Sequence, residues 1–342
     1  PDAAEQAPLL ALSNGELLRL GLISNRGMLV VAAAFGALAQ TGDNVFGVLV
    51  DRWGKVAFGW FEGFAGEHAH DSPAAIAFAV GSLVLIAVVL VRLLSVLLAF
   101  LQYYGFTLRE DDARIRVERG LLTRYRSSAK RRRIQSWSLH EGVLHRWFKR
   151  RSLRVQTASR QGGEAGQQSL KELAPVATPT HCDELIQHFL PDAGWDTLAW
   201  QPLHRHAWWR IAVPGLLLVL AGSAGLTWRF GAIGLAVLAL LPLQLWRARR
   251  IAAACGYACN DRLVAWRTGW WSKRWNFAEI GKIQALRLAQ SPLDRRLGMA
   301  NLLLDTAGAS PFGAPLHLRQ LPDDVARALS ARLVAQLSRR RV

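Results

Sequence analysis

An uncharged run of eighteen apolar residues at 74–91 constrains this chain more than any other feature of its sequence. As an α-helix the run would be about 27 Å long, because each residue adds about 1.5 Å, and this length is close to the thickness of the hydrocarbon core of a bilayer. Arg92 follows directly, at a position from which a long cationic side chain can extend to the headgroups. The run therefore predicts a transmembrane helix.

A second apolar region, at residues 207–227 and 230–246, is divided only by Trp228 and Arg229. Such a short break predicts two helices that form a tight hairpin across the bilayer. Tryptophan residues lie near the ends of both helices, as amphipathic aromatic side chains do at membrane interfaces. They are Trp208, Trp209, Trp228 and Trp246.

The apolar segment 27–39 is a weaker candidate, because thirteen residues are short for a helix that spans a bilayer. We expect a span that continues from Gly27 to about Val45, with Asp43 at its far end. A core helix or a re-entrant helix is the alternative. For Asp43, the end of a helix in water is favoured over a functional site within the membrane.

The distribution of basic residues predicts the orientation of these helices. The chain has 42 Lys and Arg residues against 25 Asp and Glu residues, which gives a net charge of +17. Residues 103–206 carry 18 of the cations and residues 247–342 carry 17, whereas residues 51–72 carry two. Because cytoplasmic segments of membrane proteins are enriched in Lys and Arg, we expect four spans, with both large soluble segments and both termini in the cytoplasm.

The two basic segments resemble one another. Residues 120–158 and 269–307 align without a gap at an offset of 149, and ten of the 39 aligned positions are identical. Alternating apolar and polar residues predict β-strands in both copies. Each copy then ends in a predicted helix, at Thr180–Leu190 in the first copy and at Pro322–Arg339 in the second. We therefore expect a repeated unit of two membrane helices followed by one α+β domain.

The first copy carries a moderately specific motif, which consists of Gly120-Leu-Leu-x-Arg, Arg133-Ile-Gln-Ser, Leu144-His-Arg and Leu153-x-Val-x-Thr-Ala. In these segments the chain resembles the bacterial pleckstrin-homology-like (PH-like) domain of the second type, formerly a domain of unknown function. Tandem copies that alternate with pairs of membrane helices resemble the YdbT-type bacterial membrane proteins. The first copy departs from the family at Lys149, whereas the second copy keeps the family's glycine there.

The resemblance implies an α+β membrane protein with two PH-like β-barrels, each capped by a C-terminal α-helix, that alternate with transmembrane helix pairs. It also implies a multi-pass protein of the bacterial inner membrane that serves envelope maintenance or stress resistance. We expect a cytoplasmic N-terminal segment at 1–26, a transmembrane helix pair with its outer loop at 27–102, the first PH-like domain at 103–195, a helical hairpin at 207–247 and the second PH-like domain at 252–340.

Basic side chains are concentrated in the first copy. Residues 120–158 hold eleven basic residues and one acidic residue, whereas residues 269–307 hold six and three. We expect this charge to serve binding or scaffolding, with anionic membrane lipid or another PH-like membrane protein of the same family as the partner. A basic character that only fixes membrane topology is the structural alternative. The candidate lipid-binding residues are Lys130, Arg131, Arg132, Arg133, Lys149, Arg150 and Arg151.

The sequence shows no motif for catalysis, since it lacks a phosphate-binding Gly-rich loop, a His-Glu-x-x-His motif and a Gly-x-Ser-x-Gly motif. We therefore expect no enzyme and no cofactor. His68, His70 and Asp71 lack supporting metal ligands nearby, so a solvated loop is the favoured interpretation. Cys255 and Cys259 lie where the repeat predicts a strand, which favours small buried side chains over a metal site.

Two other classes of function compete with binding at the membrane. A transporter or membrane enzyme would use Asp43, Arg92 or Arg210, and these charges would then face a polar cavity at membrane depth. A nucleic-acid-binding surface would use Trp137 and Trp147 as stacking platforms. Trp137 alternates with apolar neighbours on one strand face, so core packing explains it more simply, and we expect no nucleic-acid partner.

Overall fold

The computed structural model describes residues 7–40, 51–52, 55, 59, 73–158, 170–306 and 316–339. The chain divides into two compact units. The helical unit comprises Ala11–Thr107 and Glu118–Tyr125, and the sheet unit comprises Pro1–Leu10, Leu108–Val117 and Arg126–Val342.

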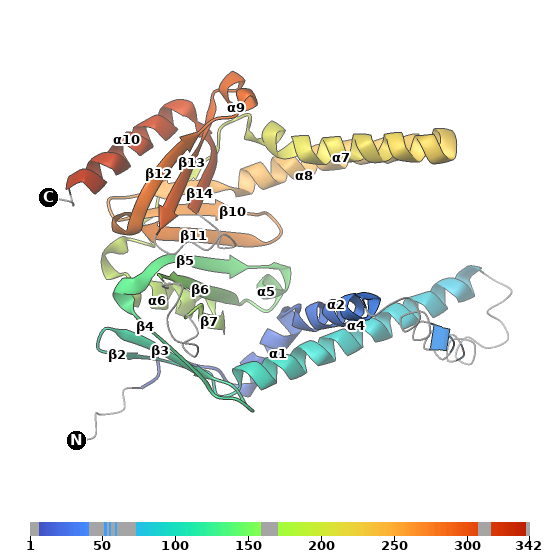
Figure 1. Ribbon diagram of the computed structural model, residues 1–342, viewed down its shortest axis with the longest axis horizontal. Coiled ribbons are helices and arrows are strands. Elements are labelled where there is room, and N and C mark those ends of the chain that lie inside the picture. The colour runs from blue at the N-terminus through green and yellow to red at the C-terminus, as the bar shows by residue number, and fades with distance from the viewer. Residues whose placement is uncertain are drawn as a thin grey trace. The chain divides into compact units, whose positions relative to one another are not determined.

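Three helices make up the described core of the helical unit: α1 (Asn14–Ile23), α2 (Arg26–Gln40) and α4 (Pro73–Tyr103). Helices α1 and α2 both pack against α4, and the chain bends by 49° between them (Figure 1).

Small side chains allow the close approach of these helices. A Cβ atom on Gly21 would clash with Val96, and a Cβ atom on Gly27 would clash with Ser95. The backbone N–H of Gly27 also donates to Ser95 Oγ over 2.9 Å. Arg92 lies beside the bend, where its Nη1 donates to the carbonyl oxygens of Leu22 at 3.1 Å and Ser24 at 3.2 Å. Arg92 therefore satisfies carbonyl groups that the end of α1 leaves without a helical partner.

Two helical segments among the described residues are long and apolar enough to cross a membrane, at Val80–Tyr103 and Ala207–Ala254. The bent pair Asn14–Ile23 and Arg26–Ala37 is also long and apolar enough to cross a membrane when it is taken as one span. The predicted helix at 74–91 is therefore present. The candidate span begins at Val80 and continues to Tyr103, so Arg92 lies within it and not at its end as the sequence predicts. The predicted continuation of the weaker span, from residue 41 to Val45, lies outside the described residues.

The segment Ala207–Ala254 is a hairpin rather than a single rod. Helix α7 (Ala207–Phe230) is followed by the 3-10 helix η4 (Gly231–Leu240) and by α8 (Leu241–Ala254), and both of these pack back along α7 (Figure 1). The chain turns at Gly231, which has a positive φ of 67°, and so not at Trp228-Arg229 as the sequence predicts. Ser223 Oγ donates to the Gly234 carbonyl oxygen over 3.1 Å, and a Cβ atom on Gly234 would clash with α7.

The two sequence copies have the same order of elements. The first copy comprises β2 (Thr107–Asp111), β3 (Arg114–Arg119), β4 (Tyr125–Lys130), η2 (Arg131–Arg133), β5 (Ile134–Glu141), α5 (Val143–Trp147), β6 (Arg151–Thr157), β7 (Glu172–Ala177) and α6 (Pro179–Phe189). The second comprises β9 (Gly256–Cys259), β10 (Leu263–Thr268), β11 (Lys273–Glu279), η5 (Ile280–Lys282), β12 (Ile283–Ala289), α9 (Pro292–Arg296), β13 (Met299–Thr306), β14 (Leu316–Pro322) and α10 (Asp323–Arg339). The predicted offset of 149 holds to within one residue up to β6 and β13, whereas the last strand and the C-terminal helix of the two copies lie closer together in sequence.

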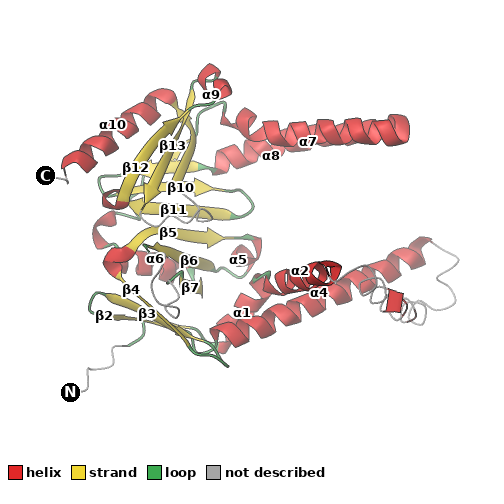
Figure 2. Cartoon of the chain, in the orientation of Figure 1, coloured by secondary structure: helices red, strands yellow, loops and turns green. Residues whose placement is uncertain are grey.

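Shorter elements complete the sheets. They are β1 (Leu10–Ala11), η3 (Pro191–Ala193) and β8 (Gln201–Pro202). Within the sheet unit, α6 packs on β6 and β7 of the first copy, and α10 packs on β12, β13 and β14 of the second (Figure 2). Each copy therefore ends in the predicted C-terminal helix.

The strands form three sheets instead of the two barrels that the resemblance implies. Their orders are β1-β2-β3-β4, β7-β6-β5-β11-β10-β9-β8 and β12-β13-β14, and the described strands close no barrel. The physical reason is that β5 of the first copy pairs antiparallel with β11 of the second, with Trp137 opposite Phe277. Ladder hydrogen bonds therefore run from one copy into the other.

An aromatic cluster fills the junction between the copies. Trp137 is 3% exposed and stacks on Phe277, with ring centroids 6.2 Å apart, and Trp195 contacts Phe277 at 4.4 Å. At the edge of the junction, His140 Nε2 lies 2.8 Å from Ser272 Oγ. The burial of Trp137 confirms that it is a core residue.

Candidate functional site

The structure separates the predicted lipid-binding residues into two groups. Residues 130–133 directly precede β5, whereas residues 149–151 lie where β6 begins. In the β5–β6 pair Ile134 is opposite Thr157 and His140 is opposite Ser152, so the two groups lie at opposite ends of the hairpin. Seven residues of strand separate these ends, which corresponds to about 23 Å at 3.3 Å per residue.

Only one of the two groups lies at the end of the sheet that carries the α7–α8 hairpin. Arg267, at the end of β10, donates from Nε to the carbonyl oxygen of Ala254, the last residue of α8, over 3.1 Å. Across the sheet, Lys273 is opposite Glu141, so residues 149–151 lie at this end. At the other end, Lys282 Nζ donates to the Arg132 carbonyl oxygen over 2.6 Å. Residues 130–133 therefore lie far from the hairpin.

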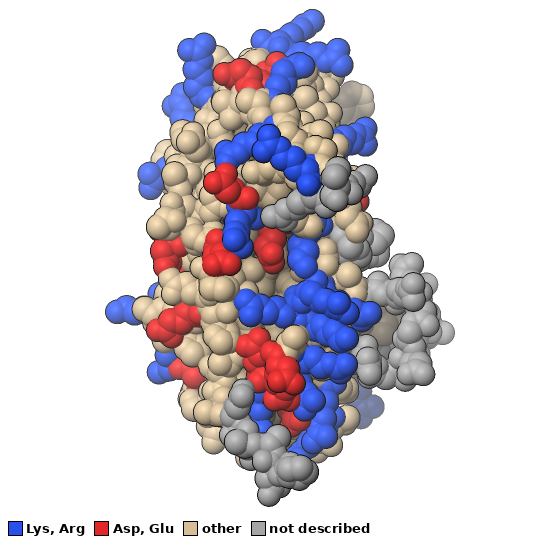
Figure 3. All heavy atoms as spheres, turned by 90° about the vertical axis from the view of Figure 1, so that its left-hand side faces the viewer, with Lys and Arg blue, Asp and Glu red and all other residues tan. Residues whose placement is uncertain are grey.

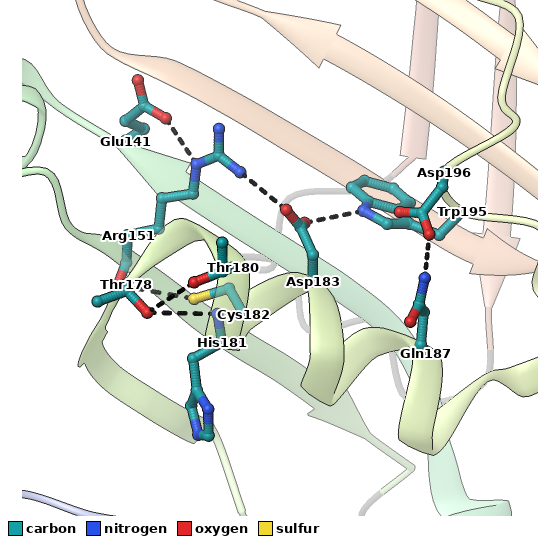
Figure 4. A network of polar contacts seen from close by, with 10 residues as sticks. All are labelled: Glu141, Arg151, Thr178, Thr180, His181, Cys182, Asp183, Gln187, Trp195 and Asp196. Atoms are coloured by element: carbon teal, nitrogen blue, oxygen red, sulfur yellow. Dashed lines mark hydrogen bonds and ion pairs between the residues drawn. The ribbon is translucent and has the colours of Figure 1, made fainter.

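Three of the predicted residues have structural contacts within the protein. Arg150 Nη1 donates to the carbonyl oxygens of Phe148 at 3.3 Å and Lys149 at 3.0 Å. Arg131 Nε donates to the carbonyl oxygen of Phe189, at the end of α6, over 2.9 Å. Arg151 forms ion pairs with Glu141 at 2.7 Å and Asp183 at 3.5 Å, and Asp183 accepts a hydrogen bond from Trp195 Nε1 (Figure 4). These contacts hold all three guanidinium groups against the protein.

A cavity of about 570 Å³ brings Lys130 and Arg132 together with residues of the β2–β3 turn and of β3, whereas Arg133 does not line it. It is lined by Asp111, Asp112, Ala113, Arg114, Arg116, Lys130 and Arg132. Four cationic side chains against two carboxylates leave a net charge of +2. Pockets of this size hold small ligands.

The local sequence explains how the cavity forms. Strand β3 alternates, so Arg114 and Arg116 are exposed while Ile115 and Val117 are buried. The backbone N–H of Arg131 donates to the carbonyl oxygen of Ala113 over 2.9 Å, which brings η2 to the β2–β3 turn. The cations of β3 and η2 therefore meet across that turn.

Most of the positive charge at the cavity is uncompensated within the part of the chain that the structure describes. Arg116 forms an ion pair with Asp111 at 2.7 Å. Arg114, Lys130 and Arg132 form no hydrogen bond or ion pair through their side chains with any described residue. Figure 3 shows Lys and Arg side chains gathered on the face that is turned away from the α7–α8 hairpin. This cavity is therefore a candidate site for an anionic group.

The equivalent place in the second copy has a different composition. At the offset of 149, Arg114, Arg116, Lys130 and Arg132 correspond to Leu263, Ala265, Glu279 and Gly281. The fold thus forms at these positions without cations, so the cations are not required by the fold.

The chain itself covers that place in the second copy. The segment after α6 lies on the β9–β10 turn, where Asn260 Nδ2 donates to the Ala193 carbonyl oxygen over 2.6 Å and Arg262 pairs with Asp192 at 2.9 Å. Beside this turn, Leu263 and Ala265 are fully buried. In the second copy, the segment after α6, which includes Asp192, therefore occupies the surface beside β10.

Sequence reasoning missed Arg114 and Arg116 as members of the site. The alternation at β3 indicates a strand, and the two arginines then look like its solvated face. The available signal was the comparison of the copies, because the same positions are Leu263 and Ala265 in the second copy.

The residues of the competing transporter function have other contacts. Arg210 Nε donates to Asp294 Oδ1 over 3.3 Å, and Arg92 binds the carbonyl groups at the α1–α2 bend. Burial would raise the pKa of Asp294, but hydrogen bonds from Ser291, the nearby Arg210 charge and a hydrogen bond from Asn301 outweigh it and lower that pKa. Asp43 lies outside the described residues.

The described residues include no cluster of His, Cys, Asp and Glu side chains that could hold a metal ion. The predicted loop residues His68, His70 and Asp71 lie outside them. Cys182 and Cys255 are buried free thiols, and burial raises the pKa of Cys182 to about 12. Cys259 ends strand β9, as the repeat predicts, but it is only partly buried, and Cys255 caps α8 directly before that strand.

The bacterial PH domain family matches the chain over residues 60–181 and 212–337, which is more than half of its length. The chain therefore belongs to this family and holds two of its domains in tandem, as the sequence motif indicates. Each matched region includes an apolar helix and one of the two copies. No curated protein and no solved structure matches the chain.

Proposed function

We propose that this chain is a scaffold of the bacterial inner membrane that displays its tandem PH-like domains to the cytoplasm and binds an acidic protein partner at the first of them. The candidate spans and the concentration of Lys and Arg in both copies support the membrane location and the orientation. The protein acts by binding and not by catalysis, without a cofactor.

The observation that carries this proposal is the cationic cavity at the end of the sheet remote from α7 and α8. With the hairpin in the membrane, Lys130 and Arg132 lie at least about 20 Å beyond the end of α8, since β11 separates them by six residues of strand. This distance exceeds the Debye length of about 8 Å at physiological salt, so the cavity attracts ligands from the cytoplasm more than lipids of its own bilayer.

The second copy indicates the chemistry of the partner. There, Asp192 of a polypeptide segment pairs with Arg262 beside the β9–β10 turn. In the first copy, the equivalent turn is flanked by Arg114 and Arg132, whose guanidinium groups bind carboxylates through paired N–H donors. A segment of a partner protein with several carboxylates fits this surface.

The test uses the full chain in lipid nanodiscs with a fluorescent deca-glutamate peptide as the probe. Replacing Arg114 and Arg132 together by Gln removes two charge-assisted contacts, and at about 1.4 kcal/mol for each tenfold change we expect at least about tenfold weaker binding. The control is the double replacement of Arg295 and Arg296 by Gln, which removes the same charge from exposed positions of the second copy.

Two outcomes would contradict the proposal. Equal weakening in both double variants would mean that the peptide responds only to net charge. The second outcome is that replacing Arg114 and Arg132 by Gln abolishes binding to anionic vesicles added in solution but leaves binding of the peptide unchanged. The ligand of the cavity would then be lipid and not a protein segment.

A further inference from the structure

We propose that a surface at the base of the α7–α8 hairpin lies in the headgroup region of the bilayer and fixes the sheet unit against the membrane. This inference rests on the proposed membrane location of the hairpin. The surface, which we name the foot, is formed by Val143, Arg146, Trp147, Lys149, Trp246, Arg250, Trp270 and Trp271.

The foot is continuous across both copies and α8. Arg146, on α5 of the first copy, donates to the carbonyl oxygens of Trp270 and Trp271 in the β10–β11 turn of the second. Trp246 of α8 meets Trp270 edge to face, with ring centroids 5.1 Å apart. The guanidinium group of Arg250 lies 5.5 Å from the centre of the Trp270 ring. These contacts place α5 and the β10–β11 turn beside the base of α8.

The foot exposes large apolar side chains. Trp147 is 79% exposed, Trp271 is 54% exposed and Val143 is 49% exposed. Exposed tryptophans beside cations are costly in water but are typical of a membrane interface, where the indole ring lies at the level of the headgroups. Lys149 and Arg250 supply the positive charge that attracts anionic headgroups. The chemistry of the foot therefore fits a lipid surface.

The first copy also exposes an apolar side chain at its equivalent turn, between β3 and β4. At the offset of 149, Trp270 and Trp271 correspond to Leu121 and Leu122, of which Leu122 is 83% exposed. The backbone N–H of Leu121 donates to the carbonyl oxygen of Leu101, on the candidate span α4, over 3.0 Å. Exposed apolar side chains thus occur in both copies at the turn that contacts a membrane helix.

The foot also gives a role to one of the predicted cations at 149–151. Lys149 adopts a positive φ of 51° in the turn before β6, and its side chain is exposed. Of the predicted lipid-binding residues, Lys149 is the one that we assign to the lipid surface. Lys130 and Arg132 at the far end of β5 bind the acidic partner instead.

The experiment measures contact with lipid in the full chain in nanodiscs that contain anionic lipid. A fluorophore is attached to Trp147→Cys, and quenching by lipids that carry a nitroxide at the headgroup is recorded. The matched control is Arg133→Cys, which is exposed at the opposite end of β5. The parent chain controls for labelling of Cys259, because Cys182 and Cys255 are buried.

We expect quenching at position 147 to be at least about fivefold stronger than at position 133. Equal and weak quenching at both positions would overturn the foot. A third label at Leu218→Cys, midway along α7, separates this failure from that of the membrane location. Quenching at 218 by a nitroxide deep in the acyl chains, without quenching at 147, refutes the foot alone. No quenching at either position refutes the membrane location as well.

Discussion

Phe277 links the two PH-like copies, and its replacement by Ala tests that link directly. The ring is fully buried between Trp137 of the first copy and Trp195 of the connecting segment. Truncation of a buried aromatic ring costs about 3–5 kcal/mol, through lost transfer free energy and the cavity that remains. The stacked arrangement adds about 0.5–1.5 kcal/mol. We therefore expect Phe277→Ala to destabilise the junction by at least about 3 kcal/mol.

Hydrogen exchange with mass spectrometry, on the full chain in nanodiscs, is the assay. Because 1.4 kcal/mol corresponds to a factor of ten in an equilibrium constant, 3 kcal/mol should speed the exchange of amides in β5 about 100-fold. The control is Leu318→Ala, which removes a buried side chain from β14 in the core of the second copy.

The control should raise exchange in β12, β13 and β14 while leaving β5 much less affected. Similar exchange of β5 in Phe277→Ala and in the parent chain would refute the reasoning, since β5 would then not depend on its partner in the second copy. Equal acceleration of β5 by both variants would also refute it, because the junction would have no particular role.

Three further predictions concern the junction between the copies, the Arg210–Asp294 ion pair and the packing of the hairpin. Burial, His145 and nearby arginines lower the pKa of His140 to about 4, so between pH 6.5 and 4 the unfolded chain binds a proton that the folded chain does not. The unfolding temperature should therefore fall between pH 7 and pH 5, and His140→Gln should reduce this fall; an unchanged pH profile would contradict it. Arg210→Gln should lower thermal stability more than Arg295→Gln, because it leaves the buried Asp294 without its ion pair; equal unfolding temperatures would contradict this. Gly234→Val should lower the yield of folded protein in detergent relative to Gly222→Val, since only the first adds a side chain against α7; equal yields would argue against the hairpin packing.

Local patterns in the sequence were sufficient for much of the fold. The run at 74–91 is uncharged over nearly the length of a bilayer core, and it lies within α4. The offset of 149 relates the elements of both copies up to β6 and β13, because one supersecondary unit is used twice. Alternation identified β3 and β6, since a half-buried strand leaves a period of two in any single sequence.

The arrangement of the strands could not be predicted in this way. Pairing of β5 with β11 depends on edges that are far apart in the chain, and no local pattern specifies which edge a strand meets. Closed barrels were expected from the family resemblance, whereas the copies share a sheet. The turn of the hairpin was also misplaced, because Trp228 and Arg229 interrupt the apolar run while the positive φ falls at Gly231.

The candidate site was predicted in part. The basic cluster of the first copy contains Lys130 and Arg132, which line the cavity. Proximity in sequence suggested that residues 130–133 and 149–151 form one surface. Strand β5 lies between them, however, and places the two groups at opposite ends of the sheet. Arg131 and Arg151 bind groups of the protein itself, which only tertiary contacts show.

Cysteine accessibility on the two sides of the membrane tests the central claim most directly. Arg133→Cys places a thiol at the end of the sheet remote from the hairpin, and Trp228→Cys places one near the tip of α7, where the native side chain is 93% exposed. We expect a membrane-impermeant thiol reagent to label position 133 only in inside-out vesicles and position 228 only in intact spheroplasts. Labelling of both positions from the same side would contradict a hairpin that crosses the membrane and holds the PH-like domains in the cytoplasm.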